Sequence, residues 1–166
     1  IVDNIGSYTF APYKVVWKNI AGAITGKAEF SCAVLSDVED KYLGRKTAIP
    51  NVKLMLVPLS SEDEAYYLAG VLNSVLVRFI VASYVIETGI STHITDIVKV
   101  PRFDINNVLH RKISELSRRA HAIAKCIHAR ARPDYCKDAG NPEEELARVE
   151  DELDRAVAQL YGIPED

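Results

Sequence analysis

A glycine-rich segment between two predicted strands is the first place where this sequence could hold a phosphate. Gly22-Ala-Ile-Thr-Gly26-Lys27-Ala28 is one residue shorter than the phosphate-binding loop G-x-x-x-x-G-K-[ST], and Ala28 replaces the hydroxyl that binds Mg²⁺. That loop also opens a helix, whereas the residues after Lys27 resemble a strand. We therefore expect no nucleotide site. The segment is either a plain loop of small residues or a flexible loop that carries Lys27 towards a polyanion.

A second group has the composition of a metal site without its arrangement. His121 and His128 share one face of a predicted helix, Cys126 lies off that face, and the chain has no C-x-x-C pair. Neither a G-x-S-x-G nor an H-E-x-x-H motif is present, and Glu143-Glu-Glu145 is typical of a first helical turn. We therefore expect no catalytic residue, metal or cofactor in this chain.

Lysine and arginine side chains could instead contact a phosphate backbone. Residues 1–60 contain seven basic and five acidic residues. The densest cluster is Lys41, Arg45 and Lys46, where Gly44 gives the backbone freedom to approach a ligand. An ordinary solvated loop would explain this cluster equally well. The complete set of candidate DNA-binding residues is Lys18, Lys27, Lys41, Arg45, Lys46, Lys53, His93, Lys99 and Arg102.

The charge of the whole chain conceals a division along it. The net charge is −3, and a domain that binds nucleic acid by itself is more often basic. However, residues 105–132 contain seven basic residues and one acid, and residues 133–166 contain three basic residues and eleven acids. Either two helices face each other and partly neutralise these charges, or the basic face contacts a phosphate backbone.

The first two thirds of the chain predict a small sheet and one long helix. Ser61 and Glu64 form an S-x-x-E capping box, after which apolar residues recur at helical spacing until about Ser83. The stretch 36–48 is polar and charged, which predicts a loop. The predicted strands are 13–18, 28–35 and 53–59, with a further short strand over 96–100 that ends at Pro101.

The last third predicts two amphipathic helices. Apolar residues from Leu109 to Ile127 and from Leu146 to Leu160 repeat every three or four positions, and Asn141-Pro142 is a typical helix start. The expected fold is therefore α+β, with a small, mainly antiparallel sheet packed against a long helix. Residues 1–104 form the sheet-plus-helix core, and residues 105–166 form a C-terminal antiparallel helical hairpin within one compact domain.

The length and the cysteine content indicate the number of domains and the cellular compartment. A chain of 166 residues is typical of one domain, and no apolar run is long enough to span a membrane. Three widely spaced cysteines fit no disulfide framework, which favours a reducing compartment and hence the cytoplasm. The sequence begins at Ile1 and has no signal peptide, so we interpret it as a piece of a larger protein.

A series of short segments occurs in an order that matches a known family. The segments are Tyr13-Lys-Val-Val-Trp-Lys18, Ile49-Pro50 with Lys53-Leu-Met-Leu-Val-Pro58, Glu64-Ala-Tyr-Tyr-Leu-Ala-Gly-Val-Leu-Asn73-Ser74, Ile97-Val-Lys-Val-Pro101-Arg-Phe103-Asp104, His110-Arg-Lys-Ile-Ser-Glu-Leu-Ser117 with Ala120-His121, and Asp154-Arg-Ala-Val-Ala-Gln-Leu-Tyr161-Gly162-Ile163. Together they resemble the C-terminal target-recognition domain of adenine-specific DNA methyltransferases. This TaqI-like specificity domain also occurs in single-chain restriction-modification enzymes.

The resemblance implies a role that is not catalytic. In that family a separate N-terminal domain binds S-adenosylmethionine and methylates a flipped adenine, while the C-terminal domain selects the sequence of double-stranded DNA. The matching motifs have the character of structural residues, so the resemblance transfers no base contact. The alternatives are a protein-interaction module that docks a partner through the C-terminal helical hairpin, and a small enzyme in its own right.

Overall fold

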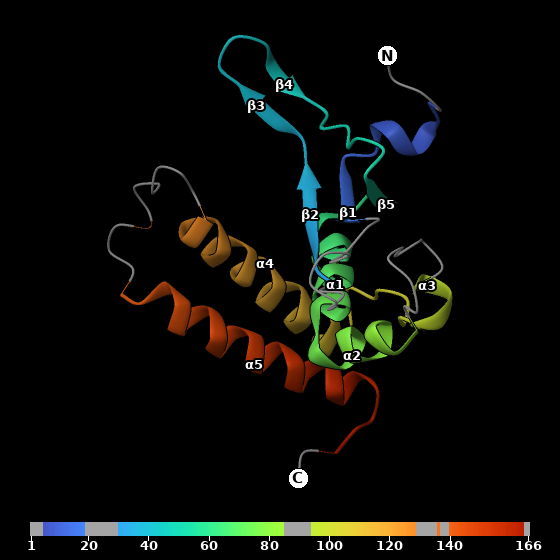
Figure 1. The fold of residues 1–166 in the computed structure, drawn as a ribbon, viewed down its shortest axis with the longest axis vertical. Helices are drawn as coiled ribbons and strands as arrows, with labels where there is room; N and C mark the ends of the chain where they lie inside the picture. Colours follow the sequence, from blue (N-terminus) through green and yellow to red (C-terminus); the bar gives the residue numbers. More distant parts are fainter. Residues whose placement is uncertain (1–4, 19–29, 85–93, 129–135, 137–139, 165–166) are drawn as a thin grey trace.

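A three-stranded antiparallel sheet lies at the centre of the computed structural model, which describes residues 5–18, 30–84, 94–128, 136 and 140–164 (Figure 1). The central strand β1 (Tyr13–Lys18) pairs with β2 (Cys32–Ser36) on one side and β5 (Leu54–Leu59) on the other. Val15 and Trp17 point from β1 into the hydrophobic core. A short 3-10 helix, η1 (Ser7–Phe10), precedes the sheet.

Helix α1 (Glu62–Asn73) packs against both the sheet and the long helix α4 (Val108–His128). It begins where the sequence predicts, since the Ser61 hydroxyl accepts a hydrogen bond from the Glu64 backbone N–H at 3.4 Å. Gly70 lets the two helices approach closely, because a Cβ atom there would lie 3.0 Å from side-chain carbons of Ile113 and Ser117. A Cβ atom at this position would require Ile113 or Ser117 to shift by a few tenths of an ångström.

Helix α5 (Pro142–Leu160) returns along α4 and completes the predicted hairpin (Figure 1). The apolar seam is internal: Leu116 and Ile123 of α4, and Val149 and Leu153 of α5, are buried in the same cluster as the sheet residues. Asn141 occupies the N-cap position of α5, although its side chain makes no capping hydrogen bond. The predicted α+β fold, with a small antiparallel sheet and a C-terminal helix pair, is confirmed.

The prediction of one helix over 62–83 was wrong. The helix breaks at Ser74, whose backbone is extended, and α2 (Val75–Tyr84) continues at an angle of 63° to α1. The carboxylate of Asp154 on α5 accepts a hydrogen bond from the Val75 N–H at 2.8 Å, which satisfies an amide at the start of α2. Tertiary contact with α5 therefore supports the bend.

The predicted strand over 96–100 was also wrong. Residues Ile94–Ile97 form a single helical turn, α3, and the Val98 N–H bonds to the carbonyl of Ile94 at 2.8 Å. Ile94 and Val98 are buried in the core. The apolar, β-branched pattern of this segment therefore reflects packing in the core and not pairing in a sheet.

The cysteine prediction was wrong as well. Cys126 and Cys136 form a disulfide across ten residues of the chain, and Cys32 is free and buried. An odd number of cysteines at wide spacing does not prevent one pair from meeting when a helix end and a loop come together. The argument for a reducing compartment loses this support, and the cytoplasmic location stays a prediction.

Within the described residues no single helix is both long and apolar enough to cross a membrane. The bent pair α1 and α2 passes that test only when its two helices are taken together, by length and composition.

Candidate nucleic-acid interface

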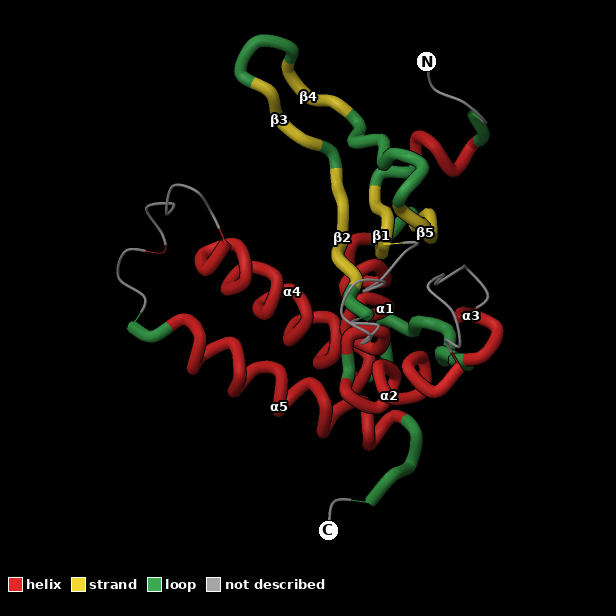
Figure 2. Tube along the Cα trace, in the orientation of Figure 1, coloured by secondary structure: helices red, strands yellow, loops and turns green. Residues whose placement is uncertain are grey.

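A β-hairpin projects from the sheet at the position where the sequence predicted a loop (Figures 1 and 2). Strand β3 (Val38–Asp40) continues the direction of β2 and pairs with β4 (Gly44–Lys46) in antiparallel register. The prediction over 36–48 failed because these strands have three residues each and bury no apolar face. Without a buried face there is no alternation of apolar and polar residues to detect.

The side chain of Asp40 stabilises the turn at the hairpin tip. Asp40 Oδ1 accepts hydrogen bonds from the backbone N–H groups of Tyr42 at 2.9 Å and Leu43 at 2.8 Å. Gly44 has a φ of 66°, the left-handed conformation that favours glycine. The tip is thus preorganised, because the amides of Tyr42 and Leu43 are hydrogen-bonded and a glycine occupies the left-handed position.

The tip exposes an aromatic ring, an aliphatic side chain and positive charge. Tyr42 is 85% exposed and Leu43 is 67% exposed. The Lys41 ammonium lies 5.5 Å from the centroid of the Tyr42 ring, and Lys46 is exposed on β4. An exposed aromatic ring offers a surface on which a base can stack, and an ammonium can contact a phosphate.

The base of the hairpin is anchored by charge. Arg45 Nε donates a hydrogen bond to Asp37 Oδ2 at 2.9 Å, and the Lys14 ammonium, only 1% exposed, donates to the Ala11 carbonyl at 2.6 Å. Burial lowers the pKa of Lys14, and the negative charge of Asp37 opposes that effect. A cavity of about 260 Å³ here is lined by Pro12, Tyr13, Ser36, Asp37, Glu39, Arg45 and Glu62.

Charge balance determines which cations remain available. Residues 37–46 contain three acidic and three basic residues, so the hairpin is neutral overall. Of the three acids, Asp37 pairs with Arg45, the carboxylate of Asp40 is engaged by the turn amides, and Glu39 is exposed on β3. Lys41 and Lys46 are therefore the hairpin cations best placed to meet a phosphate, while Arg45 would first exchange its partner.

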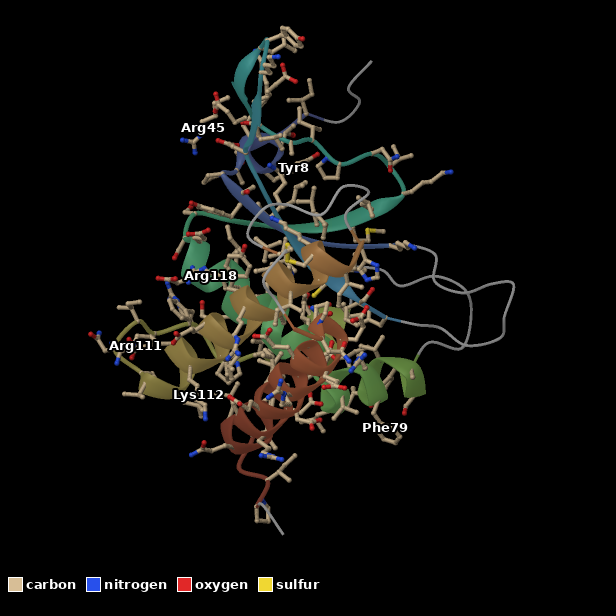
Figure 3. The ribbon with its side chains drawn as sticks, turned by 90° about the vertical axis from the view of Figure 1, so that its left-hand side faces the viewer. Tyr8, Arg45, Phe79, Arg111, Lys112 and Arg118 are labelled. Atoms are coloured by element: carbon tan, nitrogen blue, oxygen red, sulfur yellow. A yellow bond between two sulfur atoms is a disulfide. The ribbon has the colours of Figure 1, made fainter. Side chains whose placement is uncertain are left out.

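The start of α4 adds a second basic group that the candidate set had missed. Arg111 and Lys112 are exposed and form no ion pair with the described residues. Figure 3 shows Arg45, Arg118, Arg111 and Lys112 along the same side of the molecule. The signal in the sequence was the excess of basic residues over 105–132.

Two other arginines of α4 are structural. Arg118 donates to Asp63 at 2.8 Å and lies 4.8 Å from the centroid of the Tyr66 ring, and its hydrogen bond to Asp63 raises its pKa. Arg119 pairs with Glu145 of α5 at 2.8 Å. The interpretation that the helices neutralise each other is thus correct for Arg119.

The remaining predicted residues do not join the hairpin. Lys18 ends β1 beside Leu54, and Lys53 precedes that residue, so both lie at the end of the sheet opposite to the hairpin. Lys99 and Arg102 are exposed on the segment between α3 and α4. Lys27 and His93 lie outside the described residues, as does the glycine-rich segment. Of the candidates that the structure describes, Lys41, Arg45 and Lys46 are the ones that lie together on the hairpin.

Four of the segments quoted for the family resemblance contact one another. The Tyr67 hydroxyl donates to the Pro101 carbonyl at 3.0 Å, and the Tyr67 ring lies 5.4 Å from Phe103 and 4.8 Å from His110. The Tyr161 hydroxyl donates to the Lys99 carbonyl at 3.4 Å. Burial raises the pKa of Tyr67. These residues hold the scaffold together, which agrees with their interpretation as structural.

A larger cavity of about 550 Å³ lies between β2, α2, α4 and α5. Of its polar side chains, His121 accepts from the Val34 N–H at 3.2 Å and Asp154 accepts from the Val75 N–H, whereas the buried Ser117 hydroxyl has no hydrogen-bond partner among the described residues. In the described part of the chain no group of three or more His, Cys, Asp or Glu side chains is arranged to hold a metal ion. This cavity is therefore separate in place and chemistry from the hairpin.

Comparison with known proteins gives no relative: no protein-family model, no curated protein and no solved structure matches the chain.

Proposed function

We propose that this chain is a non-catalytic domain that recognises a sequence of double-stranded DNA, with the β3–β4 hairpin as the reading element. The observation that carries the proposal is the hairpin itself, which projects from the sheet with a preorganised tip and with exposed Lys41 and Lys46. The major groove of B-form DNA admits a two-stranded β-ribbon. Arg111 and Lys112 would contact the phosphate backbone beside the groove.

The resemblance to the target-recognition domain of adenine-specific DNA methyltransferases supports the same role. In that proposal S-adenosylmethionine and the catalytic residues belong to a separate domain, and no step of methyl transfer involves this chain. The net charge of −3 also implies that the isolated chain binds DNA weakly. The partner domain would contribute much of the affinity.

The test is a selection from a pool of randomised duplexes with the purified chain at low salt. A sequence-reading domain enriches one short motif, and Lys41→Ala with Lys46→Ala lowers the affinity for the enriched duplex. Lys18→Ala with Lys53→Ala is the matched control, because it removes two exposed lysines from the opposite end of the sheet. Enrichment of no motif, or an equal loss in both variants, would contradict the proposal.

The protein-interaction alternative finds less support in the helix pair. Its seam residues are buried within this chain, so an intermolecular helix partner would need to displace α5 or use the charged faces alone. Light scattering separates the two cases. A chain with an internal seam has the mass of one copy, 18.4 kDa, at all concentrations.

A further inference from the structure

Phosphate contacts do not explain the exposed apolar side chains at the hairpin tip. Tyr42 and Leu43 are adjacent, and both side chains are mostly exposed. A solvated hairpin tip needs neither, and turn residues with polar side chains would make the same backbone. Exposed apolar groups at a protruding tip are typical of contact with another molecule.

The turn also fixes the backbone from which these side chains project. Because Asp40 binds the amides of both Tyr42 and Leu43, and Gly44 supplies the left-handed turn, the tip loses little conformational freedom when it binds. The Lys41 ammonium beside the Tyr42 ring places a positive charge next to the apolar pair. A rigid apolar tip with a neighbouring cation matches the chemistry of stacked bases beside a phosphate.

We propose that Tyr42 and Leu43 insert into a base step of the bound duplex and partly unstack it, an inference that rests on the proposed function. Apolar wedges of this kind open a step at a cost that depends on its sequence, so the tip selects steps that unstack easily. Pyrimidine–purine steps such as TA are the most easily opened. The hairpin would then read deformability as well as base edges.

Fluorescence of 2-aminopurine tests the insertion directly, because this base brightens when it leaves the stack. One adenine at a time is replaced in the duplex enriched by the wild-type chain. The wild type brightens the probe at one step, and Tyr42→Ala with Leu43→Ala removes the increase and weakens binding about tenfold. The salt dependence of binding stays unchanged in this variant, since no charge is lost.

Two controls keep this result interpretable. Val52→Ala changes a residue that is 90% exposed but lies in the loop before β5, and it leaves both affinity and fluorescence unchanged. Emission from the sole tryptophan, Trp17, reports folding, because this ring is 2% exposed in the core. Tip variants with the wild-type tryptophan spectrum are folded.

The remaining outcomes overturn the inference in distinguishable ways. If the wild type binds the duplex without brightening any position, or if the tip variant binds equally well, the insertion is wrong while DNA recognition stands. If the wild type enriches no duplex, the proposed function fails and the insertion fails with it. Sedimentation with vesicles of equimolar phosphatidylcholine and phosphatidylserine that requires Tyr42 and Leu43, without brightening of DNA, would assign the tip to a membrane surface instead.

Discussion

At the scale of single residues, Asn73 shows how a side chain joins two elements. It is the last residue of α1, where its side chain accepts from the Cys32 N–H and donates to the Cys32 carbonyl, both at 2.9 Å. The amide thus pairs with the backbone of β2 as another strand would. The motif that contains Asn73 was expected to be structural, and this contact gives it such a role.

Asn73→Ala leaves the N–H and the carbonyl of Cys32 without this partner. We expect the free energy of unfolding to fall by about 2 kcal/mol, as is usual when a buried hydrogen-bonding group loses its partner. Urea denaturation monitored by circular dichroism measures the change. Asn106→Ala, in an exposed turn, is the control and stays within about 0.5 kcal/mol of the wild type. Equal stability of both variants would show that Asn73 does not bridge α1 and β2.

His121 is a second bridging residue, and its protonation is set by its partners. Nε2 accepts from the Val34 N–H at 3.2 Å, so Nδ1 carries the proton and donates to the Ser117 carbonyl at 2.8 Å. The ring is therefore neutral in the folded protein. Burial lowers its pKa below the usual value of 6.5, and Lys125 one turn along α4 adds to this effect.

The pH dependence of stability follows from that shift. Below about pH 6.5 the unfolded chain binds a proton at His121 that the folded chain does not bind, so stability is lost as the pH falls through this range. We expect His121→Gln to flatten the change in unfolding free energy between pH 7.5 and 5.5, values chosen at about one unit either side of 6.5. His128→Gln, an exposed residue on the same helix, should retain the wild-type slope.

At the scale of elements, the sequence predicts those parts whose burial follows a repeat. The strand over Tyr13–Lys18, the Ser61 cap and both C-terminal helices occur where periodicity and capping residues placed them. The β3–β4 hairpin and the bend at Ser74 were not predicted from periodicity and capping residues. The hairpin buries no face. The bend combines a local cap, in which the Ser74 hydroxyl accepts from the Val77 N–H at 3.4 Å, with a contact to Asp154 from the far end of the chain. Consequently the hairpin's basic residues were found, but their strand geometry was not.

The Cys126–Cys136 disulfide joins the end of α4 to the segment that leads to α5. Closing a loop of about ten residues stabilises a chain by about 2.5 kcal/mol in the loop-entropy model. We expect a reducing agent to lower the unfolding free energy by that amount. Thiol titration of the denatured protein checks the pairing: before reduction only Cys32 should react, and three cysteines should react afterwards. Three reactive thiols before reduction, in protein kept from reductants, would contradict the bond.

Across the whole molecule, a single hydrophobic core supports a surface on which some charged side chains form ion pairs and others are exposed without an ion pair among the described residues. Sheet residues and both C-terminal helices contribute to the same buried cluster, so the hairpin projects from a rigid body. The acidic residues of α5 belong to the C-terminal helix pair, and one of them, Glu145, forms an ion pair with Arg119 of α4. A net charge of −3 therefore does not describe every part of the surface, because Lys41 and Lys46 of the hairpin and Arg111 and Lys112 of α4 are all exposed.

The dependence of duplex binding on salt concentration tests whether the β3–β4 hairpin contacts DNA, because each phosphate contact contributes about 0.9 to the slope of log K against log salt. Lys41→Ala with Lys46→Ala should reduce the slope by about 1.8, and Lys18→Ala with Lys53→Ala should leave it unchanged. Fluorescence anisotropy of a labelled duplex over a salt series gives both slopes. An unchanged slope in the hairpin variant would remove β3–β4 from the DNA interface.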